Sequence, residues 1–207
     1  DGQFILTPSG SYIADNNLKK IGNYTPDFML GWNNSFSYKN WSLSFLFDWR
    51  QGGELVSRTR ALGTVGGQLA ETANRPEEGI VPQGVVNTGT AENPQYVPNT
   101  TAVSAETYYR QFYDRNHEEN NIYDASYLKL RQFSVGYTFN LKDGFLGLSS
   151  GMDIDLALVG RNLFAFSEIP HFDPEQLTVQ GSGFVSGVED MSYATTRSIG
   201  LKAGFNF

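Results

Sequence analysis

The chain has 207 residues, of which 14% are aromatic and 18% charged, and its formal net charge is −7. Soluble globular proteins usually carry about 25% charged residues, so the composition departs from that of an ordinary soluble domain. No apolar run approaches the roughly 18 residues that a membrane-spanning helix needs, which excludes helical spans. The absence of cysteine excludes disulfides, thiolate metal sites and a cysteine nucleophile.

The negative charge is concentrated in two segments. Residues 51–125 carry ten Asp or Glu against five Lys or Arg, and residues 164–192 carry five acids and no Lys or Arg. Binding to nucleic acid requires a basic stripe, so this distribution argues against a nucleic-acid partner. We interpret both segments as long solvated loops.

The first strands are expected after residues 1–27, whose turn-forming residues indicate a loop. Apolar residues at every second position predict strands at 28–38 and 41–50. The parity inverts between the two strands, which is expected if Lys39 and Asn40 form a two-residue hairpin loop. One face of the hairpin would then be aromatic and the other small and polar, and we expect high solvent accessibility for Trp32, Phe45 and Phe47.

Three further strands are predicted at residues 126–141, 151–163 and 193–207 from the same alternation. In the first of these, the apolar residues change phase, which a bulge near Arg131 would explain. With about 10–16 residues each, these strands are longer than the usual five or six.

Short and long connections alternate along the chain. Residues 39–40 and 142–150 form short turns, whereas 51–125 and 164–192 are long insertions. This asymmetry is typical of transmembrane β-barrels, which have short periplasmic turns and long extracellular loops, an apolar face towards lipid and a polar face towards the lumen. The predicted fold class is therefore all-β, an antiparallel transmembrane β-barrel.

Five strands cannot close such a barrel, because single-chain bacterial barrels use eight strands or more and an open edge in lipid leaves backbone groups unsatisfied. The chain starts at Asp1 without an initiator methionine or a secretory signal. We therefore expect a piece of a longer chain, with more strands upstream and residues 1–27 as an extracellular loop.

Several motifs occur in an order that is similar to the C-terminal end of the SusC/RagA family of TonB-dependent outer-membrane transporters from Bacteroidota. Residues 54–122 match no part of the family pattern. The motifs are Ile21-Gly22-Asn23, Thr25-Pro26-Asp27-Phe28, Asn34-Ser35-Phe36-Ser37-Tyr38-Lys39, Leu43-Ser44-Phe45-Leu46-Phe47, Gln51-Gly52-Gly53, Asp124-Ala125-Ser126-Tyr127-Leu128-Lys129-Leu130-Arg131, Gly136-Tyr137-Thr138-Phe139, Gly160-Arg161-Asn162-Leu163-Phe164 and Phe172-Asp173-Pro174-Glu175.

The resemblance implies a 22-stranded barrel in the outer membrane of a Gram-negative bacterium, of which this chain supplies the last five strands. It further implies an upstream plug domain, energy delivered through TonB, a SusD-like surface lipoprotein as lid, and import of oligosaccharides or peptides. A dimeric assembly is left open.

Three sets of residues are candidates for function. Polar residues of the strands would line the lumen, and aromatic residues of the long insertion would either pack the loop against itself or contact ligand or lid. The C-terminal Phe207 would be the signal that the assembly machinery reads in related barrels, or a simple interfacial anchor. The lumen residues are Asn33, Asp48, Arg50, Arg131 and Arg161, and the loop aromatics are Tyr96, Tyr108, Tyr109, Phe112, Tyr113 and Tyr123.

No catalytic, cofactor or metal site is predicted. His117 and His171 lack the spacing that places two ligands on one helix face, so both are interpreted as solvated loop residues. Oxygen ligands near them leave calcium open, although the EF-hand spacing is absent. The adjacent Glu77 and Glu78 are expected to be solvated and not a glycosidase pair.

Two other functions remain open at this point. One is a non-transporting outer-membrane barrel, such as an adhesin or another interaction protein, and the other is a soluble β-sandwich that binds sugar through exposed aromatics. The sandwich is disfavoured by the long strands and the alternating connections. An upstream plug domain with a TonB-contacting segment would distinguish the transporter from the other barrel.

Overall fold

The computed structural model describes residues 2–111, 115–141, 151–175, 178–180 and 183–206. The chain divides into two compact units, one made of Tyr24–Glu54, Asp124–Gln176 and Tyr193–Phe207, and the other of Asp1–Asn23, Leu55–Tyr123 and Leu177–Ser192. Strands dominate, and none of the helices in the described part of the chain is long and apolar enough to cross a membrane.

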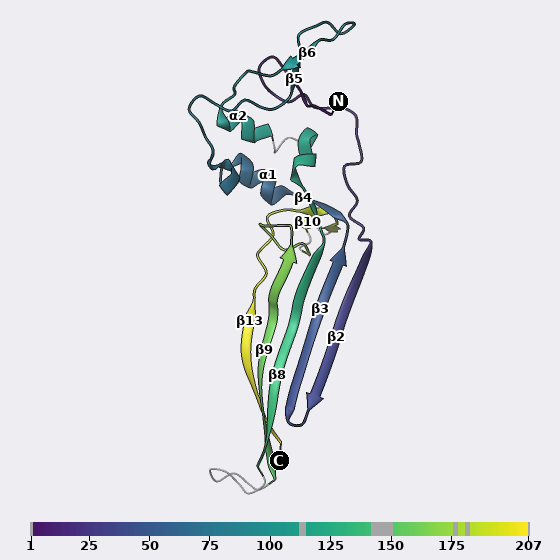
Figure 1. The fold of residues 1–207 in the computed structure, drawn as a ribbon, viewed down its shortest axis with the longest axis vertical. Coiled ribbons are helices and arrows are strands. Elements are labelled where there is room, and N and C mark those ends of the chain that lie inside the picture. The colour runs from purple at the N-terminus through teal and green to yellow at the C-terminus, as the bar shows by residue number, and fades with distance from the viewer. Residues whose placement is uncertain (1, 112–114, 142–150, 176–177, 181–182, 207) are drawn as a thin grey trace. The chain divides into compact units, whose positions relative to one another are not determined.

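The first unit is a five-stranded sheet in the order β13-β9-β8-β3-β2, and all its neighbouring strands are antiparallel (Figure 1). Its strands lie close to the predicted ranges, but β9 continues four residues beyond the expected end at 163 and β13 begins at 198 instead of 193. The predicted short turn 142–150 lies outside the described residues. The strands are β2 (Phe28–Tyr38), β3 (Trp41–Gln51), β8 (Tyr127–Leu141), β9 (Met152–Ser167) and β13 (Ser198–Asn206).

Both local features predicted for this sheet are present. Tyr38 pairs with Trp41 across a two-residue turn, in which Lys39 takes a left-handed φ of 54°. The pairing of β8 with β9 and with β3 shifts by one residue at Arg131, where β9 contributes the extra residues Asn162 and Leu163. A bulge of this kind changes the direction of side chains locally.

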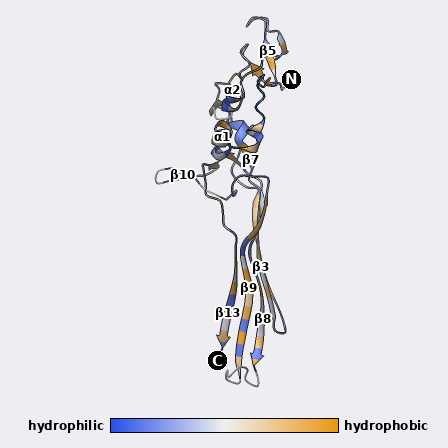
Figure 2. Cartoon of the chain, turned by 90° about the vertical axis from the view of Figure 1, so that its left-hand side faces the viewer, coloured by the Kyte–Doolittle hydropathy of each residue, from blue (hydrophilic) through white to orange (hydrophobic). Residues whose placement is uncertain are grey.

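The two faces of the sheet differ in chemistry, as the alternating colours along β9 in Figure 2 show. One cross-strand row joins Trp41, Tyr137 and Leu156, and the next row on the opposite face joins Ser42, Gly136 and Ala157. The polar face needs small residues, because a Cβ at Gly136 would lie only 2.7 Å from Ser42 Oγ. We call these the apolar face and the polar face.

The aromatic residues of the apolar face contact one another and are not enclosed in a core. Trp32 is 53% exposed, as expected, whereas Phe45 and Phe47 are only half-buried. The reason is ring packing within the face, since the Phe45 ring centroid lies 5.3 Å from that of Trp32 and 5.5 Å from that of Phe47. The apolar face is therefore continuous across β2 and β3.

The other unit is built from short elements, where the sequence predicted only long loops. Its helix α1 begins after Ser57, whose Oγ accepts a hydrogen bond from the Arg60 amide at 3.0 Å as an N-cap. Within the described residues, the helices are α1 (Arg58–Val65), α2 (Ala105–Arg110) and the 3-10 turns η1 (Ala70–Ala73) and η3 (Arg115–Asn121). The strands form three small sheets, namely β1 (Ile5–Leu6), β5 (Val85–Asn87) and β6 (Tyr96–Pro98); β4 (Glu54–Ser57), β7 (Ile122–Asp124) and β12 (Val188–Glu189); and β10 (Thr178–Gln180) with β11 (Gly183–Val185).

Candidate functional site

A cavity of about 500 Å³ lies on the polar face of the five-stranded sheet. Strand register explains its position, because Asp48 pairs with Gly31 on one side while Gln132 pairs with both Leu46 and Arg161. Glycine at position 31 leaves space in front of the strand, since a Cβ there would meet no other atom within 4 Å. The lining residues are Gly31, Leu46, Asp48, Arg131, Gln132, Arg161 and Asn162.

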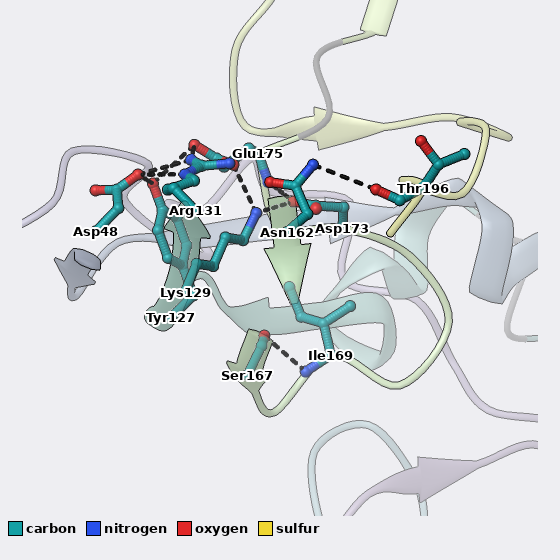
Figure 3. Close-up of polar contacts among 10 residues, drawn as sticks. All are labelled: Asp48, Tyr127, Lys129, Arg131, Asn162, Ser167, Ile169, Asp173, Glu175 and Thr196. Carbon is teal, nitrogen blue, oxygen red and sulfur yellow. Dashed lines mark hydrogen bonds and ion pairs between the residues drawn. The ribbon is translucent and has the colours of Figure 1, made fainter. Parts of the chain in front are cut away.

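Arg131 joins the cavity to an acidic segment that follows β9. Its guanidinium donates to Asp48 Oδ2 from Nε at 3.0 Å and from Nη2 at 2.6 Å, and Nη2 also donates to Glu175 Oε1 (Figure 3). Tyr127 strengthens this connection, because its hydroxyl lies 3.0 Å from Glu175 Oε1. Strand β3, strand β8 and the segment after β9 therefore meet at one guanidinium.

Lys129 forms the second half of the cluster. Its ammonium group donates to Asp173 Oδ1 and, at 2.6 Å, to Glu175 Oε2. The Lys129 side chain is only 5% exposed, and its nitrogen lies 4.6 Å from the centre of the Tyr127 ring. A buried lysine is tolerated where carboxylates neutralise it, as they do here. We call Asp48, Tyr127, Lys129, Arg131, Asp173 and Glu175 the charge cluster.

The cluster holds its two loop carboxylates in the ionised form. Burial by itself would raise the pKa of Asp173, but the hydrogen bond from Lys129 and the Glu175 backbone amide more than offset it, so the pKa lies below its ordinary value. Burial likewise acts against the ionisation of Glu175, whose pKa is nevertheless lowered by Arg131 and Lys129. The arrangement is an ion-pair network.

Of the predicted lumen residues, the cavity brings together Asp48, Arg131 and Arg161. Arg161 is exposed, and the adjacent Asn162 takes a left-handed φ of 49° in the bulge and donates to Thr196 O at 3.3 Å. Asn33 is exposed on the same face without lining the cavity. A conformation that asparagine tolerates better than most residues thus shapes the cavity wall.

Arg50 lies on the polar face of β3 with the other predicted lumen residues, but it does not line the cavity. It is 5% exposed, donates to Tyr24 O at 2.6 Å and lies 4.6 Å from the centre of the Tyr24 ring. Its guanidinium binds the segment that leads into β2. Arg50 is therefore not a cavity-lining residue.

Three of the four loop aromatics in the described part of the chain contact other residues of the insertion. The Tyr109 hydroxyl lies 3.0 Å from Glu71 O and 3.1 Å from Asn74 O, the Tyr108 ring packs on Tyr109 at 5.2 Å, and Arg60 lies 5.7 Å from the Tyr123 ring centre. These contacts are within the insertion. Tyr96 is 52% exposed on β6, and Phe112, Tyr113 and Phe207 lie outside the described residues.

The two histidines differ. His171 is exposed, as expected, but the expectation for His117 is wrong, because that side chain is 8% exposed and its ring lies 6.2 Å from the Tyr12 ring. Packing of the N-terminal segment on η3 buries it, which spacing along the chain does not reveal. Within the described ranges, no three His, Asp or Glu side chains come together as metal ligands.

Sequence reasoning missed Tyr127, Lys129, Asp173 and Glu175 as site residues. The motifs 124–131 and 172–175 contain these four residues. The two acids that flank Pro174, shortly after a predicted strand, were the signal that could have indicated a site. Nothing in the sequence pairs them, since Lys129 and Asp173 are 44 positions apart.

Comparison with known proteins identifies the family. The chain is 31% identical over 163 residues to TonB-dependent receptor P3 of Formosa agariphila, covering 79% of this chain and 14% of the receptor. The chain belongs to the TonB-dependent receptor family. It is also 27% identical over 208 residues to TonB-dependent receptor P26 of the same organism, with 94% of this chain and 18% of the receptor covered.

The chain thus spans less than a fifth of the length of these TonB-dependent receptors. Two solved structures share its fold at 20% identity: the RagAB peptide transporter, with a TM-score of 0.51 over 88% of this chain and 17% of the other, and the RagAB peptide importer in a closed-closed state, with 0.52 over 95% and 19%. No family model matches the sequence. The names of these relatives describe receptors and transporters, not enzymes.

Proposed function

We propose that this chain is the C-terminal part of the transmembrane β-barrel of an active importer in the outer membrane of a Gram-negative bacterium. The observation that carries the proposal is the five-stranded antiparallel sheet with one aromatic and one polar face, in a member of the TonB-dependent receptor family. The apolar face would contact lipid and the polar face would line the passage.

The open edges of the sheet support a larger barrel. Within the described residues, β2 and β13 each pair with one strand only, so both carry unpaired backbone groups. In lipid such edges are costly, and partner strands from the rest of the receptor would satisfy them. A closed barrel of 22 strands with an upstream plug is the form that the SusC/RagA resemblance implies.

The cavity would then be part of the passage wall, and the segments 1–27, 51–125 and 164–192 would be extracellular. The proposed cargo is an oligosaccharide or a peptide, and the name of the RagAB transporter supports the peptide. Energy would come through TonB from an upstream segment, and a SusD-like lipoprotein would cover the outer opening.

The proposal is tested by deleting the gene of the full-length receptor and growing the strain on individual peptides and glycans. Loss of growth on one class, restored by the wild-type gene but not by a gene lacking the TonB-contacting segment, is the expected result. Unchanged growth on every nutrient, with the receptor present in the outer-membrane fraction, would instead identify a non-transporting barrel.

A further inference from the structure

The segment 169–175 belongs to the unit with the five-stranded sheet and is packed within it. Ile169 is 7% and Phe172 8% exposed, and Pro174 is buried as well. Ile169 N donates to Ser167 Oγ at 3.1 Å where the segment leaves β9, and Glu175 N donates to Asp173 Oδ1 at 3.0 Å at its other end (Figure 3). Apolar contacts and local hydrogen bonds thus define its conformation.

The acidic end of this segment is held on the polar face by both cations of the charge cluster. Lys129 binds Asp173 and Glu175, and Arg131 binds Glu175 and Asp48 together. Arg131 and Asp48 also line the cavity, so the segment is bonded to a residue of the cavity wall without lining the cavity itself. Strands β3 and β8 and the segment are therefore connected through one set of charges.

Release of the segment would be unfavourable. Lys129 is 5% and Asp173 9% exposed, so separating them leaves a lysine that has lost both its carboxylates and an arginine that has lost one of two. Breaking a pair of this kind is strongly destabilising, because an uncompensated charge stays in a poorly solvated place. The segment is expected to stay closed under ordinary conditions.

We propose that the segment 169–175 is a strap, latched to the polar face by Lys129 and Arg131, that narrows the passage beside the cavity. The proposal rests on the proposed function, because only in a barrel does the polar face border a passage. The strap would then restrict by size what reaches the cavity wall, independently of any lid protein.

The test uses the full-length receptor in isolated outer membranes, with single cysteines in a background free of other reactive thiols. Ile169→Cys reports on the latch, since a buried thiol reacts only when the strap opens, and Gln132→Cys reports on access to the cavity. Labelling rates are measured with a small maleimide and with a bulky polyethylene-glycol maleimide, with and without Asp173→Asn and Glu175→Gln together.

We expect the double substitution to raise labelling of Ile169→Cys by the small maleimide about tenfold or more, a shift of about 1.4 kcal/mol in opening. At Gln132→Cys, the small reagent should react at the same rate in both backgrounds. The labelling rate of the bulky reagent there should rise by about the same factor as that of the small reagent at Ile169→Cys. The matched control is Asp15→Asn with Glu106→Gln, which removes two exposed carboxylates elsewhere and should change neither rate.

Equal labelling of Ile169→Cys with and without the substitutions would show that the charges do not latch the strap. Faster labelling there with no change for the bulky reagent at Gln132→Cys would show that the strap does not narrow the passage. If the double variant does not assemble, Glu175→Gln alone keeps the Lys129–Asp173 pair and is judged by the same two rates. Because no cargo is needed, this result is separable from the growth test of import.

Discussion

At the scale of single residues, Lys129 is the side chain on which the charge cluster depends most. It is nearly buried and bonds two carboxylates, and a substitution that removes its charge leaves the buried Asp173 without its cation. Exposed ion pairs behave differently, because water and salt screen them. The Lys19–Asp15 pair of this chain is of that exposed kind.

Replacing Lys129 by methionine, which keeps the length of the side chain, is expected to lower the free energy of unfolding by about 3–5 kcal/mol. The reason is the buried Asp173, which loses its main partner. Denaturant unfolding of the full-length receptor in detergent micelles measures the change. Lys19→Met is the matched control and should leave the midpoint unchanged, and an equal effect of the two would contradict the importance of burial.

The carboxylates of Asp173 and Glu175 predict that the stability of the folded protein depends on pH. The pKa values of Asp173 and Glu175 are lowered in the folded protein, so their ionisation contributes stability above their ordinary pKa of about 4. That contribution is lost as the pH falls through the lower, folded values. The unfolding midpoint of the wild type should therefore exceed that of the Asp173→Asn, Glu175→Gln variant by a constant amount above about pH 5.

Below about pH 4 the two midpoints should converge, because protonated wild-type carboxyls resemble the substituted amides. The same titration of the Asp15→Asn, Glu106→Gln variant provides the comparison for general acid effects. A difference that persists or grows in acid would show that the two carboxylates stabilise the fold by something other than their charge.

At the scale of elements, alternation along β2, β3, β8 and β9 places the aromatic residues, Tyr127 excepted, on one face. Phe45 lies in the middle of β3, and its ring contacts Trp32, Phe36 and Phe47. Ser44, its neighbour, points to the opposite face, where it pairs with Ser35 and Ser134. Substitutions at Phe45 and Ser44 therefore test the apolar face and the polar face separately.

Phe45→Arg is expected to destabilise the receptor by about 2–4 kcal/mol, the cost of a cation facing lipid near the middle of a membrane barrel. Ser44→Arg, on the polar face, should cost much less, since the passage provides water. Unfolding in phospholipid vesicles measures both variants. Equal costs for the two, or a larger cost for Ser44→Arg, would argue against lipid on the aromatic face.

At the scale of the whole molecule, the segments 51–125 and 164–192 are not independent loops. The buried carboxylate of Glu189 accepts from Ser57 Oγ at 2.9 Å and Thr59 Oγ1 at 2.5 Å, and β12 pairs in parallel with β4. Residues from both segments thus form one compact unit. A unit with its own sheets and helices is suited to present a binding surface.

Deleting residues 60–115 from the full-length receptor is expected to leave the barrel assembled while reducing uptake or association with the lid protein. The five-stranded sheet takes its contacts from other parts of the chain, so its register should survive. Resistance of the folded barrel to unfolding on unheated gels reports assembly, and uptake of the cargo found in the growth test reports function. Normal uptake by the assembled deletion variant would exclude a role for this unit in capture.

Much of the sheet could be predicted from the local alternation of apolar and polar residues. The hairpin at Lys39 and Asn40 and the bulge at Arg131 each follow from a change of parity, which is a property of neighbouring residues. The helices α1 and α2 were missed because they are short, and their stability depends on packing more than on an apolar period. The contact of Arg50 with Tyr24 could not be predicted from alternation, because Tyr24 lies outside the strands.

The sequence by itself determined the strands, their two faces and the family resemblance, because period-2 alternation and turn residues act over a few positions. Only the tertiary structure decided the charge cluster, the strap and the joining of the two insertions. Asp48 and Arg131 are 83 positions apart and Lys129 and Asp173 are 44, so sheet order and the return of the chain after β9 bring them together. Charged residues that the sequence predicts to be solvated form a strong ion-pair network where the fold buries them, because burial removes the water around them.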